Sequence, residues 1–362
     1  MRTLVTGATG AIGIPLIDEL LAHGHRVTVL VRSKTNRSLQ DVTKLYRGKV
    51  GILEGDVSEV NCGVPTAVLR RNIGSFDAII HAAGKVQYHE HKREETYRAN
   101  VGGAENTIAL ATDLEIERFV FISTAYVAGK KLYFGEGDIG SVADAHNPYE
   151  SSKIEAERLV RNFPGEHLIL RLSTVIGHSQ TGFIVNVGGY AGFVKVFWVM
   201  RKRIARYPDN PFWVGLNPAS TLNLVTSNWV VEHSRKATES NLTGTFHLSH
   251  PTPVGMGWLF RETFRNKKAL DLPLTYEHTV VDHSALFGRD PVWESTQEGI
   301  AEIVEYFRPY VTRDTVFGHE RVKLIPGYEP PQLIDENVIA AQMDYMLNQL
   351  FTKKKLAAVA VA

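Results

Sequence analysis

The stretch Thr6-Gly7-Ala8-Thr9-Gly10-Ala11-Ile12-Gly13 decides the fold of this chain. It follows two apolar residues, Leu4 and Val5, which predict a short strand. It precedes a segment from Ile14 to Leu21 whose apolar residues recur with helical spacing. The sequence therefore predicts a strand, a tight glycine-rich turn and a helix, in that order, at the N-terminus.

Such a turn needs glycine at three places: where the backbone reverses, where a pyrophosphate comes close, and where the helix packs on the strand. Gly7, Gly10 and Gly13 occupy these places. The N-terminus of the following helix then offers free backbone N–H groups to phosphate. We therefore predict a dinucleotide site, the alternative being a glycine-rich loop without a ligand. The loop residues expected to bind the cofactor are Gly7, Thr9, Gly10, Ala11, Ile12 and Gly13.

The second predicted strand, from Arg26 to Val31, is followed by basic rather than acidic residues. A site that prefers NAD usually carries an acidic residue here, which binds the ribose hydroxyls. This chain has Arg32 and Lys34 instead, with Arg37 close behind. Positive charge suits a 2′-phosphate, so the expected cofactor is NADPH in preference to NADH. The alternative is a solvated surface loop.

Two further strand ends are expected at the same edge of the sheet. Gly55-Asp56-Val57 closes a strand that starts near Val50, and Ala82-Ala83-Gly84 closes a strand that starts at Ala78. The carboxyl ends of parallel strands line the cofactor crevice in such folds. We expect Asp56 and Val57 near the adenine, and Ala82, Ala83 and Gly84 where the backbone approaches the cofactor. The predicted fold class is α/β, a Rossmann-type doubly wound parallel sheet.

Hydroxyl side chains follow a fifth predicted strand, from Arg118 to Ile122. Ser123-Thr124-Ala125-Tyr126 stands at its end, facing the same crevice. Tyr149 and Lys153 are four residues apart on a predicted helix, from Tyr149 to Asn162, and should share one face. A free tyrosine titrates near 10, and an adjacent ammonium favours the phenolate, which would bring its pKa closer to neutrality. The alternative is a tyrosine and a lysine on an ordinary surface helix.

With these motifs the chain resembles the extended branch of the short-chain dehydrogenase/reductase superfamily, over roughly residues 1 to 250. The resemblance implies a hydride-transfer site in which Tyr149 donates or accepts the proton and Lys153 assists it and holds the cofactor ribose. Thr124 takes the position of the triad hydroxyl. Asn100 matches an asparagine that supports the lysine through water.

Two segments resemble the branch of fatty acyl-CoA reductases and thioester reductase domains: Ile122 to Val127, and Leu222 to Val231, which departs from the branch at Asn228. This resemblance implies an NADPH-dependent reductase of an acyl thioester, releasing an aldehyde or an alcohol. The alternatives are a carbonyl reductase or hydroxyl dehydrogenase of a hydrophobic small molecule, a sugar-nucleotide epimerase or dehydratase, and a non-catalytic dinucleotide-binding protein. Chain length, carrier and final product stay open.

The apolar run from Phe183 to Met200 favours a hydrophobic substrate, and it is too short and too interrupted to span a membrane. The alternative is a core helix pair. Arg201, Lys202, Arg203 and Arg206 follow. This basic edge would meet the phosphate of coenzyme A, the phosphopantetheine of an acyl carrier protein or a membrane surface, unless it is a solvated helix end.

Composition bounds the remaining possibilities. A net charge of +1, from 40 basic and 39 acidic residues, argues against nucleic-acid binding. The single cysteine, Cys62, and an N-terminus without signal-peptide character predict a cytoplasmic protein. No metal site is predicted, because His89-Glu90-His91 has no third ligand pattern. The resemblance to the extended branch implies a homodimer.

The expected domains follow from these assignments. Residues 1–180 and 219–250 should form the nucleotide-binding domain, with strands from Thr221 to Val225 and from Thr245 to Leu248 returning to the main sheet. Residues 181–218 and 251–352 should form a smaller, discontinuous substrate-binding cap. Residues 353–362 are expected to be a flexible tail.

Overall fold

The computed structural model describes residues 1–32, 36–265, 270–277 and 290–352. The chain forms two compact units. The first unit comprises Met1–Ser173, Ser227–Ser249 and Val316–Pro330, and the second comprises Thr174–Thr226, His250–Thr315 and Pro331–Ala362. The tail expected at 353–362 lies outside the described residues.

A seven-stranded sheet runs through the first unit, in the order β12-β7-β5-β4-β1-β2-β3, and all its neighbouring strands are parallel. The strands are β1 (Arg2–Thr6), β2 (Arg26–Val31), β3 (Gly51–Glu54), β4 (Ala78–His81), β5 (Arg118–Thr124), β7 (Glu166–Leu172) and β12 (Gly244–Leu248). The order reverses beside β1, where β2 lies on one side and β4 on the other. This reversal is the switch point at which such sheets bind ligands. The predicted Rossmann-type fold is confirmed.

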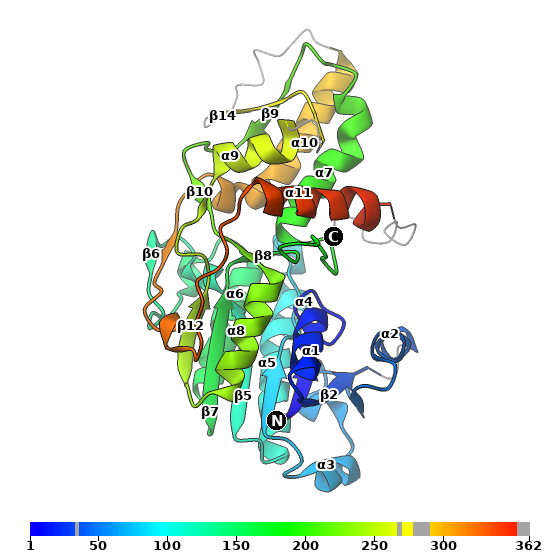
Figure 1. Ribbon diagram of the computed structural model, residues 1–362, viewed down its shortest axis with the longest axis vertical. Helices are drawn as coiled ribbons and strands as arrows, with labels where there is room; N and C mark the ends of the chain where they lie inside the picture. Colours follow the sequence, from blue (N-terminus) through cyan, green and yellow to red (C-terminus); the bar gives the residue numbers. More distant parts are fainter. Residues whose placement is uncertain (33–35, 266–269, 278–289, 353–362) are drawn as a thin grey trace. The chain divides into compact units, whose positions relative to one another are not determined.

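Helices accompany this sheet. They are α1 (Gly13–Ala22), α2 (Asn36–Tyr46), α3 (Thr66–Asn72), α4 (Arg93–Tyr97), α5 (Gly103–Asp113), α6 (Pro148–Arg161) and α8 (Ser227–Glu239). Helices α1 and α8 lie side by side, and α4 and α5 both pack against α6 (Figure 1). Strand β5 is buried along its whole length. Strands that are covered on both faces have continuous apolar sequences, and for this reason they could be predicted from the sequence.

A two-stranded pairing explains why residues 316–330 belong to the first unit rather than to the expected cap. Strand β15 (Val316–Phe317) pairs in parallel with β6 (Tyr133–Phe134), which follows β5 in the chain. The Glu136 carboxylate then accepts a hydrogen bond from Val322 N at 2.9 Å. Such a short pairing carries little periodicity, so the sequence did not reveal it.

The second unit has its own core. Its helices are α7 (Gly189–Ile204), α9 (Met256–Phe260), α10 (Pro291–Val311) and α11 (Glu336–Tyr345), and its strands are β8 (Thr174–Ile176), β9 (Phe212–Gly215), β10 (Thr221–Leu222), β11 (Leu224–Thr226), β13 (Val254–Gly255) and β14 (Leu274–Glu277). Three two-stranded sheets pair β8 with β11, β9 with β14 and β10 with β13. Helices α7 and α10 pack together (Figure 1).

The segment from Thr221 to Val225 does not return to the main sheet, so that part of the sequence interpretation was wrong. Its residues form β10 and β11, which pair with β13 and β8 inside the second unit. Only the later predicted strand, β12, joins the main sheet, beside β7. Short apolar strands have the same sequence pattern whichever sheet they join.

The apolar run from Phe183 to Met200 lies largely in one core helix, α7, where the alternative interpretation expected a pair of core helices. Phe193 and Phe197 of α7 are buried, and both pack against Phe264. None of the described helices has the length and apolar character that crossing a bilayer requires. Most of the apolar side chains of this run are therefore already buried within the second unit. The run offers little support for a hydrophobic substrate.

Candidate active site

The glycine loop after β1 is crowded by the protein itself at two of its three glycines. Gly7 has φ +76°, and a Cβ there would lie 2.7 Å from the Ala82 carbonyl carbon. A Cβ on Gly13 would lie 2.0 Å from Gly7 O. At Gly10 a Cβ would meet only Gly7 O, at 3.1 Å, so most of the space there is free of protein. The loop thus keeps room for a ligand where a pyrophosphate was expected.

The start of α1 suits an anion. Helix α1 has no acidic residue in its first turn, and no side chain caps its N-terminus. Its first N–H groups and the positive end of its dipole can therefore serve a phosphate. Thr9 is exposed, and Ala11 and Ile12 are half-buried. These features fit the pyrophosphate of a dinucleotide.

The other strand ends lie at the same edge of the sheet as this loop. One carboxylate oxygen of Asp56, after β3, accepts hydrogen bonds from Ser58 N at 3.0 Å and Ser58 Oγ at 2.8 Å. Val57, beside it, is half-buried. After β4, Ala83 N donates to Thr6 Oγ1 at 3.2 Å, which ties this turn to the end of β1. Ala82 and Ala83 are half-buried and Gly84 is exposed, so their backbone is open to a ligand.

The basic residues expected to read a 2′-phosphate are partly described. Arg32 is exposed at the end of β2, and Lys34 lies outside the described residues. A cavity of about 680 Å³ opens beside Thr9. Three of its lining residues are basic, Lys44, Arg47 and Lys49. The acidic residue Asp41 lines it as well, so basic residues outnumber acidic ones on this side of the glycine loop.

Helix α6 carries the predicted tyrosine and lysine, and its sequence explains where it begins. The Asn147 side chain accepts a hydrogen bond from Glu150 N at 3.0 Å, and Pro148 occupies the first helical position. Asparagine is a preferred N-cap, and proline is favoured at the first position because its missing N–H is not needed there. This start places Tyr149 in the first turn of the helix and Lys153 one turn later.

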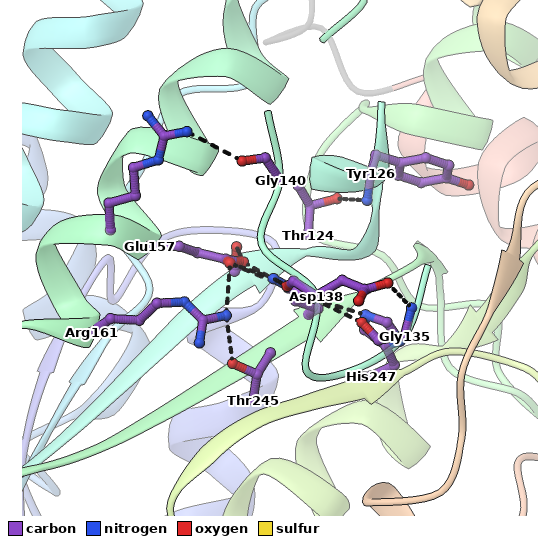
Figure 2. A network of polar contacts seen from close by, with 12 residues as sticks. Thr124, Tyr126, Gly135, Asp138, Gly140, Glu157, Arg161, Thr245 and His247 are labelled. Atoms are coloured by element: carbon purple, nitrogen blue, oxygen red, sulfur yellow. Dashed lines mark hydrogen bonds and ion pairs between the residues drawn. The ribbon is translucent and has the colours of Figure 1, made fainter. Parts of the chain in front are cut away.

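The side chain of Thr124 lies beside that of Tyr149. The Thr124 side chain is hydrogen-bonded to Tyr149, an interaction that favours the phenolate. Thr124 Oγ1 also accepts a hydrogen bond from Tyr126 N at 3.3 Å, which fixes its orientation (Figure 2). A hydroxyl pair of this kind can bind a carbonyl oxygen and pass a proton to it.

The pKa of Tyr149 is not lowered, contrary to our expectation. Burial raises it to about 12, the charge of Glu150 acts in the same direction, and the hydrogen bond with Thr124 opposes them. Between Tyr149 and Lys153, both in the described part of the chain, there is neither a hydrogen bond nor a ring contact. The ammonium of Lys153 contacts β5 instead.

Lys153 is buried, and its Nζ donates to Ile122 O at 2.7 Å. The same nitrogen lies 3.9 Å from the centre of the Phe121 ring. Burial lowers the pKa of Lys153 to about 7, and the charge of Glu157 opposes this effect. The lysine is therefore poised to titrate near neutrality.

Asn100 lies on a π-helical turn, Arg98–Gly102, between α4 and α5. Its Nδ2 donates to Lys85 O at 2.9 Å and to Ser152 Oγ at 2.8 Å, and its Oδ1 accepts from Lys85 N at 2.7 Å. Ser152 immediately precedes Lys153 on α6. Single π-turns within α-helices often mark functional sites. The structure thus brings Asn100 to the catalytic helix through Ser152.

Sequence reasoning missed two features of this site. The ring of Tyr88 packs edge-on against Tyr149, with ring centres 6.5 Å apart. A buried ion pair joins Glu157 to Arg171, and Glu157 also accepts a hydrogen bond from Ser123, the residue before Thr124. Tyr88 stands four residues after Gly84 with no recurring pattern. Glu157 follows Lys153 at helical spacing, which was the one available signal.

Cys62 has no place in this chemistry. It is fully buried, and burial raises the pKa of its thiol to about 12. A protonated buried thiol is a poor nucleophile.

Comparison with known proteins identifies the class. The pattern of the male sterility protein family, NAD_binding_4, matches residues 5–234. The NRPS-like oxidoreductase fscA of Fusarium equiseti is 26% identical over 193 residues, 51% of this chain and 18% of that protein. A farnesyl-dihydroquinoline-oxide ketoreductase of Stigmatella aurantiaca is 31% identical over 190 residues, 51% and 53% of the two chains. A UDP-glucose 4-epimerase of Yersinia enterocolitica is 27% identical over 193 residues, 51% and 56%.

A solved structure extends the similarity in fold to almost the whole chain. The terminal R domain from the myxalamid PKS-NRPS biosynthetic pathway superposes with a TM-score of 0.75 and 22% identity, covering 98% of this chain and 92% of that domain. By contrast, the matches to the three curated relatives span between 18% and 56% of those proteins' length.

The family match and these relatives place the chain among the extended short-chain dehydrogenases/reductases, a class of NAD(P)-dependent enzymes that includes oxidoreductases and epimerases. Within that class, the chain belongs to the male sterility protein family, whose domain binds a nicotinamide dinucleotide.

Proposed function

We propose that this protein is an NADPH-dependent reductase of an acyl thioester, which it converts to an aldehyde or an alcohol. The observation that carries the proposal is the hydrogen-bonded pair of Thr124 and Tyr149, on the same edge of the sheet as the glycine loop. Lys153 and Asn100 support the helix that bears Tyr149. The similarity to an NRPS-like oxidoreductase, and the resemblance of Ile122 to Val127 to thioester reductases, favour a thioester as the substrate.

The residues of this chain would act on the carbonyl oxygen. A bound reduced nicotinamide supplies hydride to the carbonyl carbon. As negative charge develops on the oxygen, Thr124 and Tyr149 stabilise it, and Tyr149 gives up its phenolic proton. The raised pKa keeps Tyr149 protonated before the reaction, as an acid must be. The C–S bond of the resulting thiohemiacetal then breaks, and the thiol leaves with a proton as the aldehyde forms.

Lys153 would favour the phenolate that this proton transfer leaves behind. An ammonium near the phenolate stabilises negative charge, whereas a neutral amine does not. Because burial lowers the pKa of Lys153 to about 7, its charge depends on pH near neutrality. We also propose that Lys153 binds the ribose of the cofactor, as the resemblance implies.

NADPH is the proposed form of the cofactor. Arg32 stands at the end of β2, where a 2′-phosphate would lie, and it is exposed. The basic residues around the cavity beside Thr9 support the same choice. The thiol part of the substrate would come from coenzyme A or from an acyl carrier protein. Exposed Lys202 and Arg203, at the end of α7, support such an anionic partner.

A carbonyl reductase of a hydrophobic small molecule is the second candidate, favoured by the ketoreductase that is 31% identical. It would use the same hydroxyl pair, and no thiol would leave. An epimerase is the third, and it would show no net oxidation of the cofactor.

One assay separates these candidates. NADPH oxidation would be followed against acyl-CoA thioesters of several chain lengths and against the matching aldehydes, with thiol release measured in the same cuvette. Oxidation of one NADPH per released thiol is the expected result if the reaction stops at the aldehyde, and two NADPH per thiol if it continues to the alcohol. Oxidation with aldehydes alone would move the protein to the carbonyl reductases. A Tyr149→Phe variant is the control, because it should retain the cofactor and lose both signals.

A further inference from the structure

A buried ion pair lies behind the proposed hydroxyl pair and joins α6 to β7. Glu157 is 2% exposed and Arg171 is fully buried. Arg171 Nη2 donates to Glu157 Oε2 at 2.7 Å, and Arg171 Nε donates to Oε1 at 3.0 Å. Such a fork-like pair fixes both groups in direction as well as in distance. Charges are costly to bury, so this pair calls for an explanation beyond packing.

The same carboxylate also holds the end of β5. Ser123 Oγ donates to Glu157 Oε1 at 2.6 Å. One helical turn earlier, Lys153 Nζ donates to Ile122 O at 2.7 Å. Two residues of α6, Glu157 and Lys153, therefore form hydrogen bonds with two successive residues of β5, Ser123 and Ile122. Because neighbouring side chains of a strand point to opposite faces, fixing Ser123 also fixes the direction of Thr124.

The remaining donors of Arg171 hold the chain that leads into α6. Its Nη2 also donates to Asp138 O at 2.7 Å, and its Nη1 lies 3.3 Å from His247 Nε2. Figure 2 shows Asp138 and His247 together on one side of this network, and Glu157 and Arg161 of α6 on the other. The carboxylate of Glu157 is therefore held by hydrogen bonds from Ser123 and Arg171, and Arg171 is itself fixed by its other partners.

Charge is unevenly distributed in this layer. The ionisable groups that meet here are Lys153, Glu157 and Arg161 from α6 and Arg171 from β7. His81 on β4 and His247 on β12 face the same layer and are neutral at pH 7, because burial lowers the pKa of each to about 3. Tyr149 is uncharged as well. Glu157 therefore supplies the negative charge that partly balances three buried or half-buried cations.

We propose that Glu157 is a positioning residue of the reacting centre: through Ser123 it directs Thr124 towards Tyr149, and through its charge it keeps Lys153 an ammonium. This role rests on the proposed function only in that Thr124 and Lys153 act on a substrate. The two parts of this role can be measured separately. The positioning of Thr124 affects turnover, and the charge of Glu157 affects the titration of Lys153.

The variant Glu157→Gln tests the charge, with Glu155→Gln as the matched control. Glu155 lies on the same helix, is paired with Arg158 near the surface, and undergoes the same chemical change. The Cε chemical shift of Lys153 would be followed against pH by NMR in protein that carries 13C-labelled lysine, a readout that needs neither a substrate nor access of a reagent to this buried amine. In Glu157→Gln we expect the midpoint to move down by about one pH unit, since an opposite charge favours the ammonium. In Glu155→Gln it should not move.

The variant Ser123→Ala tests the positioning and leaves the buried ion pair intact if Glu157→Gln does not fold. With a substrate found active in the assay above, we expect kcat to fall about tenfold with KM and NADPH affinity unchanged. Ser123→Thr keeps the hydroxyl and should restore most of the turnover. The basic limb of the pH profile should stay in place in Ser123→Ala and move to lower pH in Glu157→Gln.

Two results would overturn the proposal. One is an identical Lys153 midpoint in Glu157→Gln, in Glu155→Gln and in the unaltered protein. The other is full turnover in Ser123→Ala. If instead no thioester or aldehyde is turned over by the unaltered protein, the proposed function fails, and the NMR titration of Lys153 still decides the charge role of Glu157.

Discussion

Asn100 donates a hydrogen bond through Nδ2 to Ser152 Oγ, over 2.8 Å, and so ties the π-helical turn after α4 to the catalytic helix. Ser152 Oγ passes the interaction on by donating to Tyr149 O at 2.8 Å. The same asparagine satisfies both the N–H and the carbonyl of Lys85. One buried amide therefore sets the relation between the turn after β4 and the helix that bears Tyr149 and Lys153.

Replacing Asn100 by Ala should affect both stability and turnover. The backbone groups of Lys85 would lose their partner, at a cost of about 1–3 kcal/mol in the free energy of unfolding. We also expect kcat to fall about tenfold, because the first turn of α6 loses its support. Asn72→Ala is the control, since Asn72 Nδ2 bonds only to Val68 O within α3. Equal losses in the two variants would remove any special role for Asn100.

Gly13→Ala should damage the nucleotide site more than any other single methyl group. The added Cβ would lie 2.0 Å from Gly7 O, so α1 and the loop must move apart. We expect a loss of stability of about 1–3 kcal/mol and a large loss of cofactor affinity, measured by urea unfolding and by fluorescence titration. Gly192→Ala is the matched control in α7, where a Cβ would meet nothing within 4 Å. Unchanged cofactor affinity in Gly13→Ala would contradict the role given to the loop.

Local patterns made part of this site readable from the sequence. The glycine loop and the pair of Tyr149 and Lys153 are spaced by the geometry of a single turn or a single helix. The end of an apolar strand indicated the group Ser123, Thr124 and Tyr126, and only the resemblance to the superfamily singled out Thr124. Arg171 was not, because its partner Glu157 lies 14 residues away on another element and meets it only in the folded chain. The direction of the Lys153 ammonium depends likewise on how β5 packs against α6.

The division into units was harder to predict for the same reason. Sequence periodicity identifies a strand and leaves its partner open, so β11 was assigned to the main sheet although it pairs with β8. The pairing of β15 with β6 joins residues more than 180 positions apart through two residues each, too few to leave a pattern. Both errors come from tertiary pairing that overrides local signals.

Tyr149→Phe removes the proposed acid and little else. The change deletes one hydroxyl, so kcat should fall by about 10²–10⁴-fold, the range typical of general acid catalysis. NADPH affinity should change by less than about threefold, since the ring and the helix remain. Tyr133→Phe is the control, because Tyr133 is exposed on β6. Near-normal turnover in Tyr149→Phe would show that another group donates the proton.

Arg32→Ala should weaken NADPH far more than NADH. A guanidinium at the end of β2 would bind the 2′-phosphate through charge-assisted hydrogen bonds, which NADH cannot form. We expect about a tenfold loss of NADPH affinity, equal to about 1.4 kcal/mol, with NADH affinity nearly unchanged. Arg26→Ala controls for lost positive charge, because Arg26 is exposed at the opposite end of β2. An equal loss for both cofactors would return Arg32 to an ordinary surface position.

The stability of the fold should fall as the pH falls from about 6.5 towards 5. Burial lowers the pKa of His81 and His247 from 6.5 to about 3 in the folded protein. Between those values the unfolded chain binds more protons than the folded one, so acid favours unfolding. Each histidine contributes a slope of up to about 1.4 kcal/mol per pH unit.

Urea unfolding at pH 7, 6 and 5 measures this slope, in a range where most carboxylates stay ionised. His81→Asn should lower the stability at pH 7, because the contacts of His81 with Thr6 and Thr107 change, and it should make the remaining pH dependence shallower. A stability that stays constant from pH 7 to 5 in the unaltered protein would mean that both rings accept a proton in the folded state, which their burial opposes.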